Sequence, residues 1–547
     1  MKHSANYKRF TAILLCIALL AGLFTGCDLP RGAELPKQDI VVLYTNDVHC
    51  AVDSGIGYAG LAALETEYRN TGADVILVDC GDAIQGEPIG TISKGAYIID
   101  IMNELGYDVA AVGNHEFDYG SEQFLALVEQ ADFPYLACNF RHMDTGEPVL
   151  GGSYMLEAGG VQIGFVGIAT PETITSSAPA YFQDADGNML YCFDQKADGS
   201  ELDSSVQDAV DEAKKDGADY VIALSHLGIV AENPAFSSTS VIANTTGIDV
   251  MLDGHSHHAV ACDRVQNADG EWVLLSQTGT KFDSIGMLLI QEDGSISTGL
   301  ITDYSEKDAE VEGFIQSIQA DFDAELQKVV AKTNVNLTIL DVETGERRVR
   351  NGETNMANLC VDAYRMITGA DVAITNGGGV RDNIAEGDIT YEDILKVHPF
   401  GNAICVVEVT GQDILDALEF GARLYPAENG DFLHVSGMTY EIDDSVPSSA
   451  AITEDGKFSG VAGAYRVQNV MVGDEPLDVN NVYTLASHDY FLKKGGGGFT
   501  MLQNCTMLQD SIMLDNQILI QYITEYLNGE IGRQYANPYG EGRITIK

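Results

Sequence analysis

Five short apolar segments of this chain are each followed directly by Asp, Asn or His side chains. The segments and the residues after them are Ile40–Leu43 with Tyr44-Thr45-Asn46-Asp47-Val48-His49, Val75–Val78 with Asp79-Cys80-Gly81-Asp82, Val109–Val112 with Gly113-Asn114-His115-Glu116-Phe117-Asp118, Tyr220–Leu224 with Ser225-His226, and Ile248–Leu252 with Asp253-Gly254-His255-Ser256-His257. Such runs predict buried strands, and α/β enzymes place their chemistry at the C-terminal ends of strands. Carboxylates bridge divalent cations, neutral imidazoles bind Zn, Mn, Fe or Ni, and an amide oxygen completes a site without adding charge. The pattern predicts a hydrolase site for two metal ions.

The candidate ligands form a set rather than a collection of isolated polar residues. They are Asp47, His49, Asp82, Asn114, His226, His255 and His257, which suffices for two metals when one Asp is shared. A single His after a strand is usually an ordinary hydrogen-bonded residue. Here, however, six of the 11 histidines lie in these motifs or next to them, at positions 49, 115, 226, 255, 257 and 258. Chance does not account for that concentration.

The elements that must position these residues occupy more than one domain. From about residue 39 to 305, apolar runs alternate with stretches of helical spacing, which favours an α/β domain of sheets with outer helices. The expected helices are Leu61–Arg69, Tyr97–Leu105, Ser121–Gln130 and Ser204–Lys215. Glu306–Thr333 lacks Pro and has apolar residues at helical spacing, which predicts one long helix within a linker and hinge at 306–335. Residues 336–547 begin a new α+β pattern.

The N-terminus predicts export. Basic residues precede the apolar run Thr11–Leu23, which is too short to span a bilayer comfortably. Leu23-Phe24-Thr25-Gly26-Cys27 resembles the lipobox of a bacterial lipoprotein signal, in which Cys27 would become the lipidated first residue. An ordinary cleaved signal peptide is the alternative. We expect a signal peptide at 1–26, a tether at 27–38, and membrane contact only through a lipid on Cys27.

The net charge of the chain limits the classes of molecule that it can bind. There are 30 Lys and Arg residues against 82 Asp and Glu residues, a formal net charge of −52. Such a surface repels nucleic acid duplexes and suits an exported protein that must stay soluble. The ten cysteines are scattered without a CxxC pair, which argues against a disulfide scaffold. The sequence indicates no oligomeric state.

The ordered metal motifs resemble those of the calcineurin-like metallophosphatases. The sequence downstream narrows the resemblance to the bacterial 5′-nucleotidase family, over nearly all of the mature chain. The resemblance implies an N-terminal four-layer α/β/β/α sandwich, a linker helix and a C-terminal α+β substrate-binding domain. It also implies two divalent metal ions, such as Zn or Mn. The family pattern places the first metal at Asp47, His49, Asp82 and His257, and the second at Asp82, Asn114, His226 and His255.

Two further residues acquire roles through this resemblance. His115 matches the position that stabilises the transferring phosphoryl group in family members. Asp118, three residues later, would orient His115 through its other ring nitrogen.

A second cluster of motifs lies in the C-terminal half. Asn376-Gly377-Gly378-Gly379-Val380-Arg381 follows the apolar run Val372–Thr375. Its glycines, Gly378 among them, allow backbone N–H groups to approach an anion, and the Arg381 fork fits a phosphate. The family resemblance implies that Arg350, Arg381 and Asn376 contact the substrate. Phe432 and Phe499 match the two rings that sandwich the nucleobase, although each alone would be interpreted as a core residue.

The chain departs from its family around the second aromatic ring. Gly497 stands where relatives often carry Asp, and no acid occurs in Thr500–Cys505, where some members place an Asp for the ribose hydroxyls. Contacts to ribose should therefore be weak. We expect ribose and 2′-deoxyribose nucleotides to be used alike, and purines and pyrimidines with little preference, because stacking tolerates different bases.

These observations predict an exported two-metal phosphoesterase that hydrolyses nucleoside 5′-monophosphates. A 2′,3′-cyclic nucleotide phosphodiesterase and a nucleotide-sugar pyrophosphatase would share the motif set and remain alternatives. A surface-binding lipoprotein without catalytic activity is a more remote alternative, because every ligand position and the His115–Asp118 pair are present.

Overall fold

The computed structural model describes residues 34–177, 179–184, 188–231, 233–453, 456–493, 495–503 and 505–547. The predicted signal peptide, Cys27 and the first part of the predicted tether lie outside these residues. Within this part of the chain, no helix has both the length and the hydropathy needed to cross a membrane. The chain divides into two compact units, and one boundary between them, at Gln316 and Ser317, falls inside helix α9 (Ala309–Leu326).

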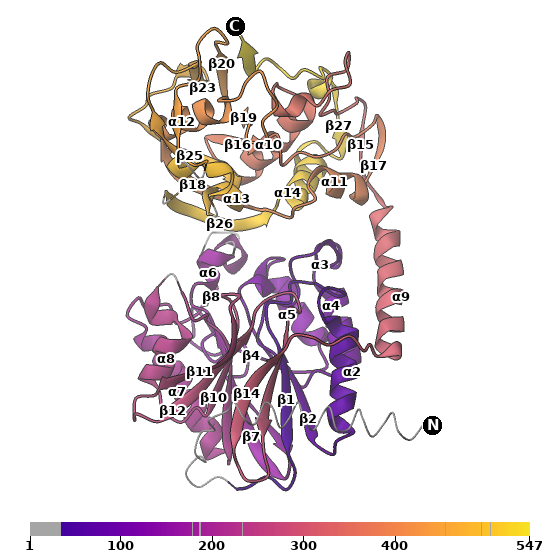
Figure 1. The fold of residues 1–547 in the computed structure, drawn as a ribbon, viewed down its shortest axis with the longest axis vertical. Coiled ribbons are helices and arrows are strands. Elements are labelled where there is room, and N and C mark those ends of the chain that lie inside the picture. The colour runs from indigo at the N-terminus through magenta and orange to yellow at the C-terminus, as the bar shows by residue number, and fades with distance from the viewer. Residues whose placement is uncertain are drawn as a thin grey trace. The chain divides into compact units, whose positions relative to one another are not determined.

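Two six-stranded sheets form the centre of the first unit (Figure 1). One has the order β14-β13-β1-β2-β3-β4, with β1 Ile40–Thr45, β2 Asp74–Asp79, β3 Val109–Ala111, β4 Tyr135–Leu136, β13 Ile285–Ile290 and β14 Ile296–Ile301. The other has the order β11-β12-β10-β9-β7-β6, with β6 Ser153–Ala158, β7 Val161–Ala169, β9 Tyr220–His226, β10 Val250–Asp253, β11 Ala259–Gln266 and β12 Trp272–Thr278. The central strands of each sheet run parallel, so their C-terminal ends lie at one edge of that sheet.

Helices cover the outer faces of both sheets (Figure 1). They are α2 Gly57–Arg69, α4 Ala96–Leu105 and α5 Ser121–Gln130 on the first sheet, and α7 Ser200–Lys215 and α8 Ser238–Asn244 on the second. One hydrophobic core lies between the sheets and includes Val42 and Phe165, and another joins the second sheet to α7 and includes Val166 and Val206. The predicted four-layer α/β/β/α arrangement is confirmed.

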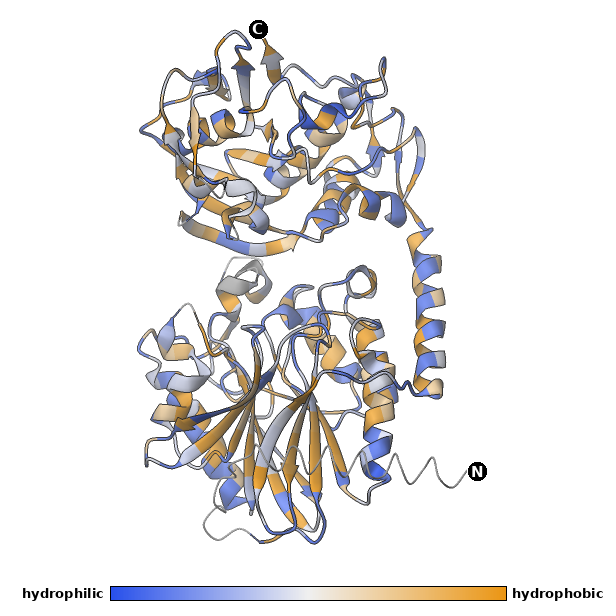
Figure 2. Ribbon diagram, in the orientation of Figure 1, coloured by the Kyte–Doolittle hydropathy of each residue, from blue (hydrophilic) through white to orange (hydrophobic). Residues whose placement is uncertain are grey.

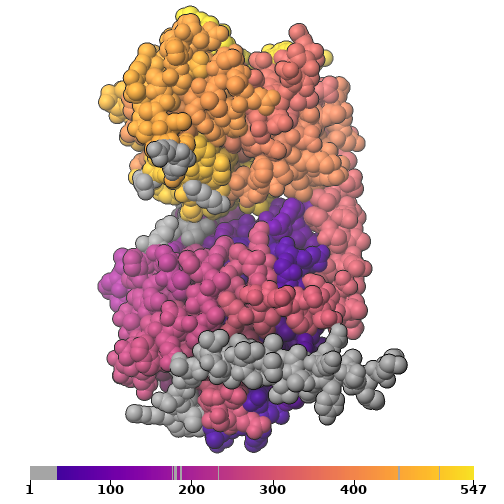
Figure 3. Space-filling view, in the orientation of Figure 1, coloured from indigo at the N-terminus to yellow at the C-terminus, as the bar shows by residue number. Residues whose placement is uncertain are grey.

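The amino-acid pattern explains these layers. All residues of β1 and β9 are buried, so both strands are apolar along most of their length rather than alternating. Figure 2 shows such hydrophobic strands between helices whose outer faces are more polar. In the space-filling view, most of the visible face of this unit consists of magenta and pink atoms, which belong to segments later in the chain than β1 (Figure 3). Strands buried on both sides are the rigid supports that a site at their ends requires.

The second unit is α+β, as predicted. Its largest sheet has the order β19-β16-β25-β18-β26, with β16 Val372–Asn376, β18 Ala403–Thr410, β19 Leu433–Ser436, β25 Val482–His488 and β26 Thr506–Leu514. Smaller sheets contain β20 Met438–Ile442, β23 Val467–Val472, β24 Glu475–Pro476 and β28 Ile544–Ile546, and β15 Val329–Thr333, β17 Gly387–Thr390 and β27 Glu530–Ile531. The helices are α10 Asn355–Thr368, α11 Tyr391–Val397, α12 Gly411–Gly421, α13 Asp489–Leu492 and α14 Asp515–Gln521. Ala373 and Ile374 of β16 belong to two different cores, because successive strand residues face opposite sides.

The predicted linker helix is wrong at its C-terminal end. Helix α9 stops at Leu326, and the last residues assigned to the helix from sequence form strand β15 instead. In β15 the buried residues Ala331 and Thr333 flank the exposed Lys332, which is the two-residue period of a strand. Its partners β17 and β27 lie far along the chain, so local periodicity could not reveal the pairing. The domain limits at 305 and 336 stay a prediction.

Candidate metal centre

The seven candidate ligands lie at or just after the C-terminal ends of five strands of the first unit. Asp47 and His49 follow β1, Asp82 follows β2 and Asn114 follows β3, all in one sheet. His226 ends β9, and His255 and His257 follow β10, in the other sheet. Because these strands are parallel within each sheet, their loops meet at the same end of the sandwich.

The structure brings six of these residues together in two groups. Asp47, His49 and His257 form one, Asp82, His226 and His255 form the other, and within each the ligand atoms lie within 4.8 Å of one another. His226 Nε2 is 2.9 Å from Asp82 Oδ2 and 3.9 Å from Asp47 Oδ1, so the groups adjoin. Asn114 Oδ1 lies 2.9 Å from His255 Nδ1, which places the amide at the second group.

Two of the imidazoles are held in the tautomer that binds a cation. His226 Nδ1 donates to the Cys80 carbonyl at 2.7 Å, and His49 Nδ1 donates to the Gln85 carbonyl at 3.1 Å. In the neutral ring each Nε2 then has a lone pair for a metal ion, as in metal-binding histidines. The buried Nε2 of His226 lies 2.9 Å from Asp82 Oδ2. Its lone pair faces the carboxylate of Asp82, and a cation between the two satisfies both.

The protonation states of two rings fit the same chemistry. His226 differs, because burial lowers its pKa but the neighbouring carboxylates of Asp82 and Asp47 raise it by more. Burial lowers the pKa of His49 and of His255 to about 4. Both rings are therefore neutral at neutral pH, which is the form that binds metal ions. The donor set of carboxylates, imidazoles and one amide suits two borderline divalent cations such as Zn or Mn.

Close packing around the ligands requires glycine at Gly113. A Cβ atom there would lie 2.2 Å from Asp82 Oδ1, so the strand end could not approach the carboxylate. The ligands themselves have an unusual backbone. Five of the seven have a positive φ: Asp47 at 51°, His49 at 49°, Asp82 at 60°, His255 at 71° and His257 at 54°. Non-glycine residues rarely adopt this region outside sites where the surroundings hold them there.

Sequence reasoning gave no role to Glu116, which holds the Asp82 loop. Its buried carboxylate accepts hydrogen bonds from the backbone N–H groups of Asp82 at 2.9 Å, Gly113 at 2.7 Å and Ala83 at 2.9 Å. The residue thus ties the loop after β2 to the loop after β3. Its position between His115 and Asp118 was visible in the sequence, but the contacts that define its role were not.

His115 and Asp118 form the pair that the sequence predicts. His115 Nδ1 donates to Asp118 Oδ2 at 2.7 Å. Burial lowers the pKa of His115, but the carboxylates of Asp118 and Asp82 raise it by more, to about 10. The His115 ring lies 5.3 Å from the His49 ring, beside the first group. The arrangement places a cationic hydrogen-bond donor next to the metal ligands.

The predicted substrate loops of the second unit also come together. Gly378 N–H and the Asn376 side-chain amide both donate to the Gly430 carbonyl, at 2.8 and 3.0 Å. Arg381 donates to the Gly378 carbonyl at 3.4 Å. Burial, followed by the positive charges of Arg347 and Arg381, lowers the pKa of Arg350, so these guanidinium groups are neighbours. Within the described chain, the buried Arg350 Nε has no hydrogen-bond partner.

Phe432 and Phe499 are not exposed rings. Their exposed fractions are 1% and 0%, and both belong to one hydrophobic core. The Phe499 ring packs 5.0 Å from Phe420 and 4.5 Å from Phe491, so aromatic neighbours occupy its surface. In this structure neither ring is open to a ligand. Their role in base stacking stays a prediction that requires the rings to become accessible.

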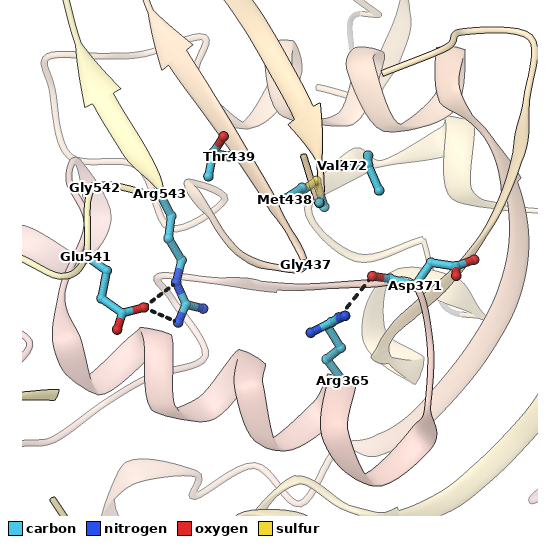
Figure 4. Close-up of a pocket in the computed structure, with 10 residues that line it drawn as sticks. Arg365, Asp371, Gly437, Met438, Thr439, Val472, Glu541, Gly542 and Arg543 are labelled. Carbon is cyan, nitrogen blue, oxygen red and sulfur yellow. Dashed lines mark hydrogen bonds and ion pairs between the residues drawn. The ribbon is translucent and has the colours of Figure 1, made fainter. Parts of the chain in front are cut away.

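A separate hollow of ≈ 600 Å³ lies elsewhere in the second unit (Figure 4). Arg543 lines it and pairs with Asp362 at 2.7 and 2.8 Å and with Glu541 at 2.7 and 3.2 Å. Arg365, also in the hollow, donates to the Asp371 carbonyl at 3.0 Å. No predicted substrate residue lines this hollow, and the Arg543 contacts serve to hold the C-terminal strand.

Two parts of the chain match the models of known protein families. The model of the calcineurin-like phosphoesterase family matches residues 40–259, and that of the 5′-nucleotidase C-terminal domain matches residues 329–504. The chain joins a calcineurin-like phosphoesterase domain to a 5′-nucleotidase C-terminal domain. All seven candidate metal ligands fall in the calcineurin-like domain, and the six predicted substrate residues fall in the 5′-nucleotidase domain. Calcineurin-like phosphoesterases use two divalent metal ions, and the two His/Asp groups could hold them.

Relatives match both domains together. A 5′-nucleotidase of Diplobatis ommata is 28% identical, with 95% of this chain and 92% of the relative covered. A 5′-nucleotidase of Vibrio parahaemolyticus is 25% identical, with 98% of each chain covered. The structure of the NAD nucleotidase of Haemophilus influenzae shares the fold, with a TM-score of 0.68 and 18% identity over 93% of this chain and 99% of that chain.

Proposed function

We propose that this protein hydrolyses nucleoside 5′-monophosphates to nucleoside and phosphate. The observation that carries the proposal is the adjoining pair of ligand groups, Asp47–His49–His257 and Asp82–His226–His255, with the His115–Asp118 pair beside them. The names of the relatives, 5′-nucleotidases in both cases, support the same substrate class. Asp82 and Asn114 would complete the two four-ligand sets expected from the family pattern.

The residues around the site would have separate roles in phosphoester hydrolysis. Two divalent cations, when bound, would supply Lewis-acid activation of water and of the phosphoryl group. His115 would donate a charged hydrogen bond to a phosphoryl oxygen through Nε2, because Asp118 holds its Nδ1. In the overall reaction, a water oxygen forms a bond to phosphorus, the bond from phosphorus to the 5′-oxygen breaks, and that oxygen takes up a proton.

The 5′-nucleotidase domain would bind the rest of the substrate. Arg350, Arg381, Asn376 and the Gly378 N–H face one region of this unit, as the contacts to Gly430 and the mutual effect of the two arginines indicate. Two neighbouring guanidinium groups suit an anionic ligand. Phe432 and Phe499 would contribute stacking only after rearrangement of the core around them.

A substrate panel tests this proposal and its alternatives. The purified full-length protein, loaded with Mn or Zn, is assayed on AMP, UMP, 2′,3′-cyclic AMP, ADP and UDP-glucose, with the products separated by chromatography. Rapid release of phosphate from AMP and UMP is expected. Preferential opening of the cyclic phosphate or cleavage of UDP-glucose would instead identify one of the alternative phosphoesterases. The Asp82→Ala variant, which lacks the predicted shared ligand, should lose all of these activities.

The protein would act outside the cytoplasm, attached to a membrane by a lipid on Cys27. The basic N-terminus, the apolar run and the lipobox-like segment support this proposal. Expression in a bacterial host with labelled palmitate should label the wild-type protein but not Cys27→Ala. Release of an unlabelled wild-type protein into the medium would indicate an ordinary cleaved signal peptide.

A further inference from the structure

The glycine-rich loop around Gly497 in the second unit leaves space that the side chain of another residue fills. A Cβ atom on Gly497 would lie 2.5 Å from Asp431 Oδ1 and 3.1 Å from the Phe499 ring. The φ of Gly497 is +63°, which also disfavours a side chain. The Asp431 carboxylate therefore occupies the place where the side chain of a residue at 497 would begin. Gly497 is the position at which the sequence lacks the acid common in relatives.

Asp431 is held firmly but not completely paired. Arg423 donates to Asp431 Oδ2 at 2.6 Å, and the Arg423 guanidinium lies 4.0 Å from the centre of the Phe420 ring. The backbone N–H of Asp431 donates to Asn429 Oδ1 at 3.1 Å. In the described part of the chain, no donor reaches Asp431 Oδ1. This oxygen is thus an oriented hydrogen-bond acceptor with a free lone pair.

The segment that carries Asp431 is bonded to the predicted substrate loop. The neighbouring Gly430 carbonyl accepts from Gly378 and Asn376, and the Phe432 carbonyl accepts from Gly377 at 2.8 Å. The negative charge of Asp431 also acts on Arg350, whose pKa it raises against the effect of burial and the other arginines. Asp431 therefore lies among the residues expected to contact the substrate.

We propose that Asp431 Oδ1 accepts hydrogen bonds from the ribose hydroxyls of the nucleotide and selects ribonucleotides over 2′-deoxyribonucleotides. The inference rests on the proposed function. Arg423 offsets the charge of the carboxylate, so an anionic substrate is not repelled, while the free oxygen still requires a donor. The side chain of Asp431 is 19% exposed, so a hydroxyl can reach it, yet water competes only in part. This reverses the expectation, drawn from Gly497 and Cys505, that ribose and deoxyribose forms are used alike.

The test compares the ratio of kcat/KM for AMP and 2′-deoxy-AMP in matched variants. The wild-type ratio should be roughly 10 to 100, as for a hydrogen bond to a charged group. Asp431→Asn should move the ratio towards one. Asp474→Asn, which removes an exposed acid on the turn between β23 and β24, should leave it unchanged. UMP and 2′-deoxy-UMP should give the same ratios, because each pair of nucleotides differs only in the 2′-hydroxyl.

Further variants separate recognition from structural support. If Asp431 only holds Arg423, then Arg423→Gln should lower kcat/KM for AMP and 2′-deoxy-AMP equally, and Asp431→Asn should do the same. Gly497→Ala places a Cβ against Oδ1 and should abolish the discrimination as Asp431→Asn does, and thermal unfolding establishes whether each variant is folded. A wild-type ratio near one, or an Asp431→Asn variant that keeps the wild-type ratio, overturns the inference while nucleotide hydrolysis stands.

A binding measurement keeps the inference testable without turnover. Calorimetric titration of the full-length protein with adenosine and with 2′-deoxyadenosine should give a roughly 10- to 100-fold difference in Kd that Asp431→Asn removes. If no nucleotide in the panel is hydrolysed, the proposed function fails, and this titration still decides the role of Asp431. Equal affinities of the wild-type protein for both nucleosides would refute that role.

Discussion

Replacing Glu116 by Gln tests how the loop that carries Asp82 is held. The Glu116 carboxylate receives three backbone N–H groups, two on Oε2 and one on Oε1. In the Gln side chain an NH₂ group replaces one oxygen, and this group cannot accept a hydrogen bond. In its better orientation the amide keeps the two bonds from Asp82 and Gly113 and turns its NH₂ towards the N–H of Ala83.

The magnitude follows from those contacts. A hydrogen bond to a charged acceptor contributes about 1.5–3 kcal/mol, and an unpaired buried N–H costs about 1–3 kcal/mol. The substitution should therefore cost about 2.5–6 kcal/mol, divided between unfolding stability and a shift of the Asp82 loop. Loss of a partner behind a ligand typically weakens metal binding or activity about 10- to 100-fold.

The assay measures bound metal, thermal unfolding and AMP hydrolysis for wild type, Glu116→Gln and Glu129→Gln, which removes an exposed acid on α5. Metal affinity is obtained by competition with a chelator. Glu116→Gln should bind metal more weakly and hydrolyse AMP more slowly, while Glu129→Gln should match the wild type. A Glu116→Gln protein with wild-type metal affinity and rate would show that the three N–H contacts do not position Asp82.

Three further predictions concern other parts of the protein. His115→Asn should retain both metals, measured by elemental analysis, but lose on the order of 10²–10³-fold in kcat; loss of metal instead would make His115 a ligand. Phe499→Ala should lower the unfolding free energy by about 3–5 kcal/mol, because the buried ring packs on Phe420 and Phe491; unchanged stability with a higher KM for nucleotides would show that the ring stacks on the base. Burial lowers the pKa of His434 to about 4, so this residue favours folding above about pH 6.5 and loses that contribution as pH falls towards 4, by up to about 3 kcal/mol. The unfolding free energy of His434→Gln, measured with denaturant, should accordingly fall less steeply than that of the wild type between pH 6.5 and 4.5. A slope equal to that of the wild type would contradict the assignment.

The spacing of apolar residues predicted the helices whose ends depend on the local sequence. Helix α5 spans Ser121–Gln130, as the apolar spacing indicated, and α4 and α2 end where the sequence placed their ends. The metal groups were predictable because each ligand follows an apolar strand directly, so the fold needs only to align parallel strands. The same reasoning failed at β15, whose partners are distant in sequence.

The second unit was harder to predict because its contacts depend on which side chain fills which space. Phe432 and Phe499 match a family pattern, but the sequence does not say whether a ring faces the core or a ligand. The role of Asp431 depends on the absence of a side chain 66 positions later, at Gly497. Such a relation appears only when the distance between Asp431 Oδ1 and the Gly497 backbone is known.

The backbone of the metal ligands explains why the site geometry could not follow from residue types. Left-handed φ values at non-glycine residues cost on the order of 1–3 kcal/mol each, and Asp47, His49, Asp82, His255 and His257 all adopt them. Hydrogen bonds between distant loops hold these conformations: Asp47 N–H donates to the Gly81 carbonyl and His49 N–H to the Asp82 carbonyl, both at 2.9 Å. His255 N–H donates to both carboxylate oxygens of Asp47, at 3.1 and 3.0 Å. Because a ligand of one group thereby fixes the loop of the other, a disturbance at either group should be transmitted to both, and the two metal sites should behave as one unit.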